Sequence, residues 1–572
     1  MKITTTFFEG VYVRYDGTEA VLGFSTKPQE ARARFLLEMK QAEGPFELRE
    51  TPCFETVGPM LDMSRNRVLT VEGVKRYLRK IQTLGMNMLM LYTEDLFEVE
   101  EYPQFGYLRG RYSIAELQEL DAYAKELGIE LIPCIQTFGH LNHFIRHPEG
   151  RAISENNNVL LPGSEETYRF IEAELKAIRK AFSTHRIHLG MDETFGLGRG
   201  KYMDRFGYRD PGEIYRDHVK RVLELTEKYF ERPMIWSDML FSNPTGRAYD
   251  GEYVIEQSVV DDSPEVDLVF WEYSREHPDF YRHVLKQHAR FKGETAFAGG
   301  VWAWNGAVPN FDYTMLTTKA ALTACAEAKV KTVIATLWVS GGCGADLDMS
   351  LPGLCAFSEY CYKGPACTDA DIFAASKALC GVDEPLSHAL SAVYQGVRSA
   401  SSLSIAFLYG DPLLDYVMWE IDYPAVMEDF RSTLALLEQY PDYEYKEFYR
   451  CFYTICLKKA DLYLNLQKAY KAGDRATLQR LADGLPALLE EYRCYYRLFK
   501  ALWKRDYKPF GMENYTHDLG GVMQRLEDTR EILCDYLKGA IPTIEELEPE
   551  RLPPQNRSYR SAASYIAFYK AM

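Results

Sequence analysis

The sequence predicts an α/β fold: a (β/α)8 TIM barrel with a small N-terminal α/β element and a C-terminal all-α helical domain. Three observations lead to this prediction. The chain has 572 residues, more than one hydrophobic core usually supports. Short β-rich apolar runs alternate with helical patterns from about Cys53 to about Leu354, and long helical patterns follow Gly364. We therefore expect three units, at residues 1–52, 53–362 and 363–572.

The first unit is too short for an independent core. Its opening stretch, MKITTTFFEGVYVRYDG, mixes charged residues into an alternating pattern. That pattern predicts a strand and not an apolar signal segment.

Eight apolar runs in the second unit have the length and composition of buried strands. They are PMLDMS from Pro59, MNMLMLY from Met86, IELIPCI from Ile129, RIHLGM from Arg186, PMIWSD from Pro233, DLVFWEY from Asp267, TAFAGGVWAW from Thr295 and KTVIATLW from Lys331. Between the first two runs, TVEGVKRYLRKIQTLG has helical spacing, with Thr70 as the N-cap and Gly85 as its end. Eight such repeats match a (β/α)8 barrel in number and length.

The third unit is rich in Tyr, Leu and Ala at helical spacing. The stretch from Asp442 predicts one long helix that ends at Gly473, with Asp474 as the N-cap of the next helix. Tyr492, Tyr496, Phe499 and Trp503 share a helix face, which indicates a packed stripe and not a ligand site. This aromatic domain is compatible with a homodimer.

Composition and charge exclude several classes of function. With 47% hydrophobic and 26% charged residues, the chain has the composition of a soluble globular protein. A formal charge of -17 without a basic stripe argues against a nucleic-acid partner. No run of eighteen apolar residues occurs, so we expect no membrane partner. Twelve cysteines without a CxxC motif predict reduced thiols and a cytoplasmic location.

Polar and aromatic side chains stand where the predicted strands end, the edge at which (β/α)8 barrels place their chemistry. In chain order they are Asp62, Arg65, Glu94, Asp95, His140, Asp192, Glu193, Trp236, Asp238, Trp271, Tyr273, Trp302, Trp304 and Trp338. Singly, a Trp is more often core and an acid more often part of a solvated loop. Together they predict a sugar site, because aromatic rings stack on the apolar faces of sugars while polar groups bind the hydroxyls.

Two other motifs carry weaker predictions. The glycine-rich run GLGRGKY from Gly196 suggests a phosphate loop, but its spacing is not GxxxxGK, so we interpret it as a flexible loop. His140, His143 and His147 could surround a metal, yet no acid stands at a standard spacing, so loop histidines are the preferred interpretation. We expect no metal and no cofactor.

The run HLGMDE, from His188 to Glu193, spans the end of the fourth predicted strand. It is similar to the H-x-G-x-D-E signature of glycoside hydrolase family 20, the β-N-acetylhexosaminidases, and the chain resembles especially the intracellular branch of this family, which has a C-terminal helical domain. MLDMSR, ending at Arg65, is similar to its sugar-gripping arginine strand, and FGH, ending at His140, to its PGH turn. The resemblance covers the barrel and, through KPFGMENYTHDLGGVMQRL, the helical tail.

The resemblance implies an exo-acting, retaining enzyme that removes terminal β-linked N-acetylglucosamine or N-acetylgalactosamine through an oxazolinium intermediate. Glu193 would be the general acid and then the base, Asp192 would orient the 2-acetamido group, and Tyr273 would bond its oxygen. His140, supported by Asp95 or Glu94, would tune Glu193. The remaining substrate contacts would be Arg65, Asp238, Trp236, Trp271, Trp302, Trp304 and Trp338.

Adjacent carboxylates also suit this mechanism physically. A retaining glycosidase with its own nucleophile needs carboxyls about 5–5.5 Å apart, facing each other across the anomeric carbon. Neighbours at one strand end cannot easily flank a sugar in that way. If the substrate's acetamide oxygen attacks instead, one acid and one orienting carboxylate suffice, and Asp192 and Glu193 can supply both.

One position departs from the family pattern. Two residues after the eighth-strand tryptophan the family commonly places an acid that binds the 4- and 6-hydroxyls, but Ser340 stands there. Asp346 or Asp348 could substitute, so the preference between gluco and galacto sugars stays open. Two alternative functions remain: a hydrolase of a related amino sugar on the same barrel, and a non-catalytic glycan-binding protein.

Overall fold

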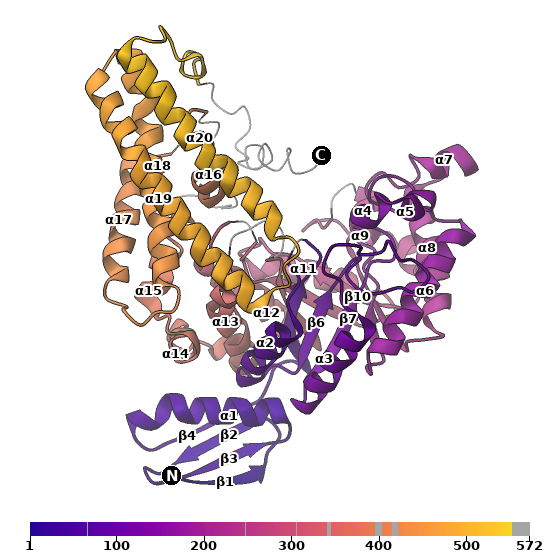
Figure 1. Ribbon diagram of the computed structural model, residues 1–572. Helices are drawn as coiled ribbons and strands as arrows, with labels where there is room; N and C mark the ends of the chain where they lie inside the picture. Colours follow the sequence, from indigo (N-terminus) through magenta and orange to yellow (C-terminus); the bar gives the residue numbers. More distant parts are fainter. Residues whose placement is uncertain are drawn as a thin grey trace.

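The computed structural model describes residues 1–65, 67–245, 248–304, 306–339, 345–394, 403–414 and 421–551. A closed barrel of eight parallel strands forms its centre, with a small sheet at the bottom of the view and long helices at the upper left (Figure 1). Ser340 and the end of the predicted helical domain, beyond residue 551, lie outside the described residues.

The barrel strands correspond to the eight predicted runs. They are β5 (Thr56–Asp62), β6 (Met88–Tyr92), β7 (Glu130–Cys134), β8 (Arg186–His188), β9 (Arg232–Trp236), β10 (Asp267–Trp271), β11 (Thr295–Gly300) and β12 (Thr332–Leu337). β12 pairs in parallel with β5, from Thr332 opposite Thr56 to Leu337 opposite Leu61, which closes the barrel. Buried side chains such as Met90 fill its interior. The predicted (β/α)8 fold is confirmed.

Helices surround these strands in the expected alternation. The main ones are α2 (Val71–Thr83), α3 (Ile114–Glu126), α6 (Glu165–Ala181), α8 (Pro211–Thr226), α9 (Asp238–Thr245), α11 (Pro278–His288), α12 (Phe311–Glu327) and α13 (Leu351–Lys363). The Thr70 side chain caps α2 by accepting from the Gly73 N–H, and Gly85 follows the helix with φ of 80°. Both predicted boundaries of this helix are confirmed.

The N-terminal element is a four-stranded sheet backed by one helix. Its strands, in the order β1-β3-β2-β4, are β1 (Lys2–Phe7), β2 (Val11–Tyr15), β3 (Glu19–Phe24) and β4 (Phe46–Glu50), and α1 (Lys27–Lys40) packs on the sheet. Arg32 of α1 is buried, with Nε 2.6 Å from Glu50 and Nη1 2.9 Å from Glu359 of α13. This ion-pair group ties the sheet to the barrel.

The C-terminal half is helical. Its helices are α14 (Asp369–Cys380), α15 (Glu384–Leu390), α16 (Leu403–Tyr409), α17 (Tyr423–Leu437), α18 (Lys446–Ala472), α19 (Arg475–Asp506) and α20 (Met512–Lys538), and the last three pack side by side (Figure 1). Gly473 ends α18 in the left-handed conformation, and Asp474 caps α19, as predicted. Of the four residues of the predicted stripe, Tyr492, Phe499 and Trp503 are buried and Tyr496 is half-buried, in agreement with packing of this face.

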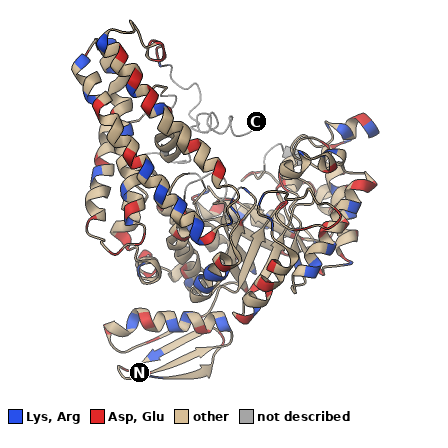
Figure 2. Ribbon diagram, in the orientation of Figure 1, with Lys and Arg blue, Asp and Glu red and all other residues tan. Residues whose placement is uncertain are grey.

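Charged residues lie mainly on the outer helices, where both signs are interspersed (Figure 2). Every helix within the described ranges is too short or too polar to cross a membrane.

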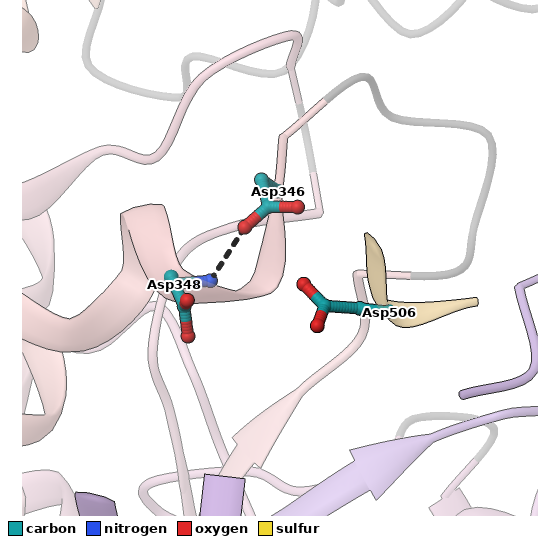
Figure 3. Close-up of side chains that lie close together, drawn as sticks. All are labelled: Asp346, Asp348 and Asp506. Carbon is teal, nitrogen blue, oxygen red and sulfur yellow. Dashed lines mark hydrogen bonds between the residues drawn. The ribbon is translucent and has the colours of Figure 1, made fainter. Parts of the chain in front are cut away.

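Three aspartates lie where the barrel meets the helical half. Asp346 and Asp348 follow β12, and Asp506 ends α19 (Figure 3). The Asp348 N–H donates to Asp346 Oδ1 over 3.1 Å. The spacing of the three acids would suit a metal ion, but side-chain cations already balance them, namely Arg76, Lys80 and Arg505. We assign the cluster to the contact between the two halves.

We expect Asp348→Asn to destabilise the fold by about 2–4 kcal/mol, because it leaves the partly buried Lys80 without its acid and removes one of the acids that balance Arg76 and Arg505. Burial alone would raise the pKa of Asp348, but the charges of Lys80 and Arg76 hold this pKa below its usual value. The free energy of unfolding in urea measures the effect. Asp262→Asn is the control, because Asp262 pairs with an Arg and a Lys, Arg216 and Lys220, at an exposed site. The control should cost less than about 1 kcal/mol, and equal losses would contradict the prediction.

Candidate active site

A cavity of about 350 Å³ opens where the barrel strands end, within the size range of small-molecule sites. The residues that line it follow strands on most sides of the barrel. They are Arg65, His140, Asp192, Glu193, Trp236, Trp271, Tyr273, Trp304 and Trp338. The structure thus brings nine of the predicted site residues to one cavity.

The backbone before and within the acidic pair has a conformation that the sequence pattern did not predict. The apolar run extends to Met191, but β8 ends at His188, since Gly190 and Met191 adopt φ of 75° and 74°. A Cβ at Gly190 would lie 2.0 Å from the side-chain oxygen of Gln136, so the turn requires glycine. Glu193 also has a positive φ, 46°. These turns bring two consecutive carboxylates to one cavity, whereas a regular strand would send them to opposite faces.

Several non-glycine residues with positive φ lie at the edge of the barrel where the strands end. Among the described residues there are six, and four of them follow barrel strands at the site: Glu94, His140, Met191 and Glu193. Each such residue costs of order 1–3 kcal/mol and persists only where its surroundings hold it, a pattern typical of functional sites.

Asp192 is held as a carboxylate. Its Oδ1 accepts from Gln136 Nε2 over 2.9 Å, and its Oδ2 lies 3.1 Å from His140 Nε2. Burial alone would raise the pKa of Asp192, but the charge of His140 and the Gln136 bond lower this pKa. Asp192 can therefore accept a hydrogen bond from a substrate while it stays ionised.

Glu193 is the more exposed member of the pair. Its side chain is 40% exposed, against 13% for Asp192, and its Oε2 lies 3.5 Å from His140 Nε2. The backbone N–H of Glu193 donates to Asp238 Oδ2 over 3.1 Å. Asp238 does not line this cavity; it lies behind Glu193 and lines a neighbouring cavity instead. Glu193 is thus placed to exchange protons with bound groups and water.

Of the two acids expected to support His140, Glu94 is the one whose charge acts on it. Asp95 pairs instead with Arg109, whose Nε lies 3.0 Å from Asp95 Oδ2, and it does not line the cavity. Glu94 lies 3.6 Å from Arg65, a cavity residue that also pairs with Asp62 at 3.0 Å. Adjacent residues thus point into different surroundings.

The aromatic side chains form a connected wall. Trp271 stacks on Tyr273 with ring centroids 5.4 Å apart, and Tyr273 meets Trp304 edge-on at 5.3 Å. Trp302 lies outside the cavity lining. It stacks on Trp304 at 4.6 Å and donates its indole N–H to the Tyr273 carbonyl over 2.7 Å. Trp302 therefore supports two cavity residues from behind.

Sequence reasoning missed Gln136 and Tyr92, which complete the hydrogen-bond chain behind Asp192. Gln136 Nε2 also donates to the Tyr92 hydroxyl over 2.9 Å, and this hydroxyl donates to Glu94 over 3.0 Å. The available signal was position, because Gln136 follows β7 by two residues and Tyr92 ends β6. His188, by contrast, is buried and accepts from the Gly190 N–H, so it supports the turn.

The remaining motifs belong to other contacts. In the glycine-rich run, the Gly200 and Tyr202 N–H groups donate to the Glu155 carboxylate over 2.8 and 2.5 Å. These backbone N–H groups are thus already bonded to a carboxylate, whereas a phosphate loop would offer them to its ligand. Within the described ranges, His140, His143 and His147 are not part of any group with metal-binding spacing.

The His140–Asp192 contact should make stability depend on pH. Burial alone would favour the neutral ring, but the Asp192 charge raises the pKa of His140 to about 9, from 6.5 in an unfolded chain. Because the folded pKa is the higher one, the stabilisation is fully present below pH 6.5 and is lost as pH rises through 9. We expect the free energy of unfolding of wild type to exceed that of His140→Gln by about 3 kcal/mol below pH 6.5. This difference should vanish above pH 9. Urea denaturation at several pH values measures it, and a constant difference would contradict the assignment.

Two family models and several known proteins match parts of the chain. The model of the glycosyl hydrolase family 20 catalytic domain matches residues 54–261, and that of the Glycoside Hydrolase 20C C-terminal domain matches residues 389–565. Hexosaminidase D of Bos taurus is 26% identical over 172 residues, which are 28% of this chain and 50% of that protein. A Vibrio furnissii β-hexosaminidase is 30% identical over 235 residues, 33% of this chain and 38% of that protein. The chain thus spans half or less of these two relatives.

Solved structures share the fold. An exo β-N-acetylglucosaminidase of Vibrio harveyi superimposes with a TM-score of 0.51 at 16% identity, over 66% of this chain and 67% of that one. A chitobiase of Flavobacterium johnsoniae gives a TM-score of 0.51 at 13% identity, over 88% of each chain.

Proposed function

Because the chain belongs to glycoside hydrolase family 20, we propose that it is an exo-acting, retaining β-N-acetylhexosaminidase whose substrate supplies the nucleophile. The substrate is a glycan or glycoconjugate with a terminal β-linked N-acetylglucosamine or N-acetylgalactosamine. One observation carries the proposal. Among the described residues that line the cavity, the carboxylates are Asp192 and Glu193, and both follow the same strand.

In the first step, Asp192 accepts a hydrogen bond from the acetamide N–H, and Tyr273 donates one to the acetamide oxygen. This oxygen attacks the anomeric carbon while the bond to the leaving group breaks. Glu193 gives its proton to the departing oxygen. The acetamide becomes a cationic oxazolinium ring, which the ionised Asp192 stabilises more strongly than it stabilises the neutral amide.

In the second step, a water molecule takes the place of the leaving group. Glu193, now a carboxylate, accepts a proton as the water oxygen bonds to the anomeric carbon. The ring bond to the acetamide oxygen breaks, which restores the amide and leaves the sugar with its original β configuration. Two inversions at one carbon thus give net retention, and Glu193 regains its proton.

The walls supply binding and orientation. Trp236, Trp271, Trp304 and Trp338 offer aromatic surface to the apolar faces of a sugar ring, and Arg65 offers a guanidinium to its hydroxyls. A cavity of about 350 Å³ suits one terminal sugar, which supports exo action. Asp238 and Trp302 contribute from outside the cavity lining, Asp238 by accepting the Glu193 backbone N–H and Trp302 by supporting Tyr273 and Trp304, whereas Asp95 pairs with Arg109.

A panel of aryl β-glycosides tests the proposal: gluco and galacto sugars with a 2-acetamido, a 2-amino or a 2-hydroxyl group. We expect turnover of the acetamido sugars alone. Turnover of the free amino sugars would favour the related amino-sugar hydrolase. Glycan binding without turnover of any member would favour a non-catalytic binding protein.

The gluco to galacto ratio in the same panel tests recognition of the outer hydroxyls. Asp346 and Asp348 are engaged by Arg505, Arg76 and Lys80 and do not line the cavity, so they offer no substitute acid there. We expect a discrimination below roughly a hundredfold, which corresponds to 2.7 kcal/mol. A cytoplasmic location and a homodimer stay predictions.

A further inference from the structure

A second cavity, of about 420 Å³, adjoins the first cavity at Glu193. Glu193 and Trp271 belong to the linings of both cavities. The other walls of the second cavity come from the loop after β8, the start of α8 and helix α9. They are Thr194, Phe195, Gly196, Leu197, Arg199, Pro211, Asp238, Met239, Ser242 and Ala248.

We propose that this second cavity binds the leaving group and that Arg199 selects leaving groups that bear an anionic substituent. The inference rests on the proposed function. A general acid must contact the oxygen that joins the sugar to its leaving group, so the leaving group lies beside this acid. If the sugar occupies the first cavity, the adjoining cavity that shares Glu193 can receive what is cleaved off.

Among the described residues that line this cavity, Arg199 is the cation, and it is free to act on a ligand. It is exposed, and within the described ranges no carboxylate lies at ion-pair distance from it. Its guanidinium lies 4.9 Å from the centre of the Tyr208 ring, a contact that orients the side chain and leaves its N–H groups open. A planar guanidinium binds a carboxylate through two parallel hydrogen bonds.

The acids of the second cavity do not cancel this charge during the first step. Glu193 carries a proton in its role as general acid. Burial and the neighbouring Asp192 charge raise the pKa of Asp238 to about 8, so Asp238 is mainly neutral at pH 7. The described lining therefore carries the positive charge of Arg199, although the whole chain carries a formal charge of -17.

The rest of the lining suits a ring with polar substituents. Phe195 is 66% exposed and can stack on a ring, while Leu197 and Met239 form a buried apolar floor. Thr194 Oγ1 and Asp238 Oδ1 are buried and have no hydrogen-bond partner among the described residues. Such unpartnered groups are costly unless a ligand or water satisfies them.

The test compares 3-carboxyphenyl and 3-carbamoylphenyl β-N-acetylglucosaminides, an anionic leaving group and its neutral counterpart, at pH 7 and low salt. The measured quantity is the ratio of their kcat/KM values in wild type, Arg199→Gln and Arg205→Gln. Arg205 is an exposed arginine of α7 (Lys201–Phe206) outside the cavity, so its variant removes the same charge nearby. The two phenols differ in their intrinsic ability to leave, but this difference is the same for wild type and both variants. It therefore cancels when the kcat/KM ratios of the three proteins are compared.

We expect the ratio to fall at least about fivefold in Arg199→Gln and to change less than twofold in Arg205→Gln; fivefold corresponds to about 1 kcal/mol. An unchanged ratio in Arg199→Gln, or an equal fall in both variants, would overturn the inference and leave the proposed function intact. If wild type cleaves neither compound, the proposed function itself fails.

Discussion

An aryl β-N-acetylglucosaminide should be cleaved about 10⁵-fold faster, or more, than the matched aryl β-glucoside. The two substrates differ only at carbon 2, where the glucoside has a hydroxyl in place of the acetamide. An intramolecular nucleophile held at attack distance contributes roughly 7–11 kcal/mol, and the described lining offers no second carboxylate across the sugar to replace it. The measurement is kcat/KM for both compounds.

The Asp192→Asn variant should show that the faster cleavage of the acetamido sugar depends on Asp192. Losing a charge-assisted bond that strengthens as the acetamide becomes cationic should lower kcat by roughly 2–4 kcal/mol, or about 30- to 1000-fold. Residual glucoside cleavage should not change in parallel, because it uses no acetamide. A thiazoline analogue of the cyclised intermediate should bind wild type far more tightly than substrate. Rapid glucoside hydrolysis, or a covalent glycosyl-enzyme on an Asp or Glu, would refute the mechanism, since either requires a protein nucleophile.

The fold was predictable because buried parallel strands are continuous apolar runs with helical spacing between them. Each of the eight runs overlaps a barrel strand, and the rim follows from the rule that barrel chemistry lies at the carboxyl ends. The family resemblance of HLGMDE then drew attention to Asp192 and Glu193. The residues near a position in the sequence are thus largely enough to predict that it lies at the end of a strand.

The contacts around the acidic pair were not predictable in the same way. The bond between Gln136 and Asp192 joins residues 56 positions apart, and a lone glutamine after a strand has no distinguishing pattern. The positive φ values of Met191 and Glu193 also leave no sequence signature. Only the preceding Gly190 has a clear reason, because a Cβ at this position would collide with the side chain of Gln136. Glu94 and Asp95 are an example. They are neighbours in the sequence, but the conformation of the chain after β6 places Glu94 where its charge acts on His140 and Asp95 where it pairs with Arg109.

Replacing Glu193 with glutamine should abolish cleavage of substrates with poor leaving groups and lower kcat/KM much less for those with good ones. An amide cannot donate the proton that an alkoxide needs on departure, and general acid catalysis typically contributes 10²–10⁴-fold. A 2,4-dinitrophenolate leaves without a proton, so its glycoside should lose roughly tenfold or less. The measurement is kcat/KM across a series of phenol and alcohol leaving groups of graded acidity.

Asp238→Ala supplies the matched control for this series. Asp238 accepts the Glu193 backbone N–H and does not line the sugar cavity, and alanine removes the acceptor that an asparagine oxygen would keep, so this variant should misplace Glu193 without removing its proton. A misplaced acid also weakens assistance to poor leaving groups, but by a smaller factor, because a carboxyl remains to donate. We therefore expect a steep dependence of log kcat/KM on leaving-group pKa in Glu193→Gln and an intermediate one in Asp238→Ala. A loss in Glu193→Gln that is equal for the dinitrophenyl and alkyl glycosides would show that Glu193 is not the acid.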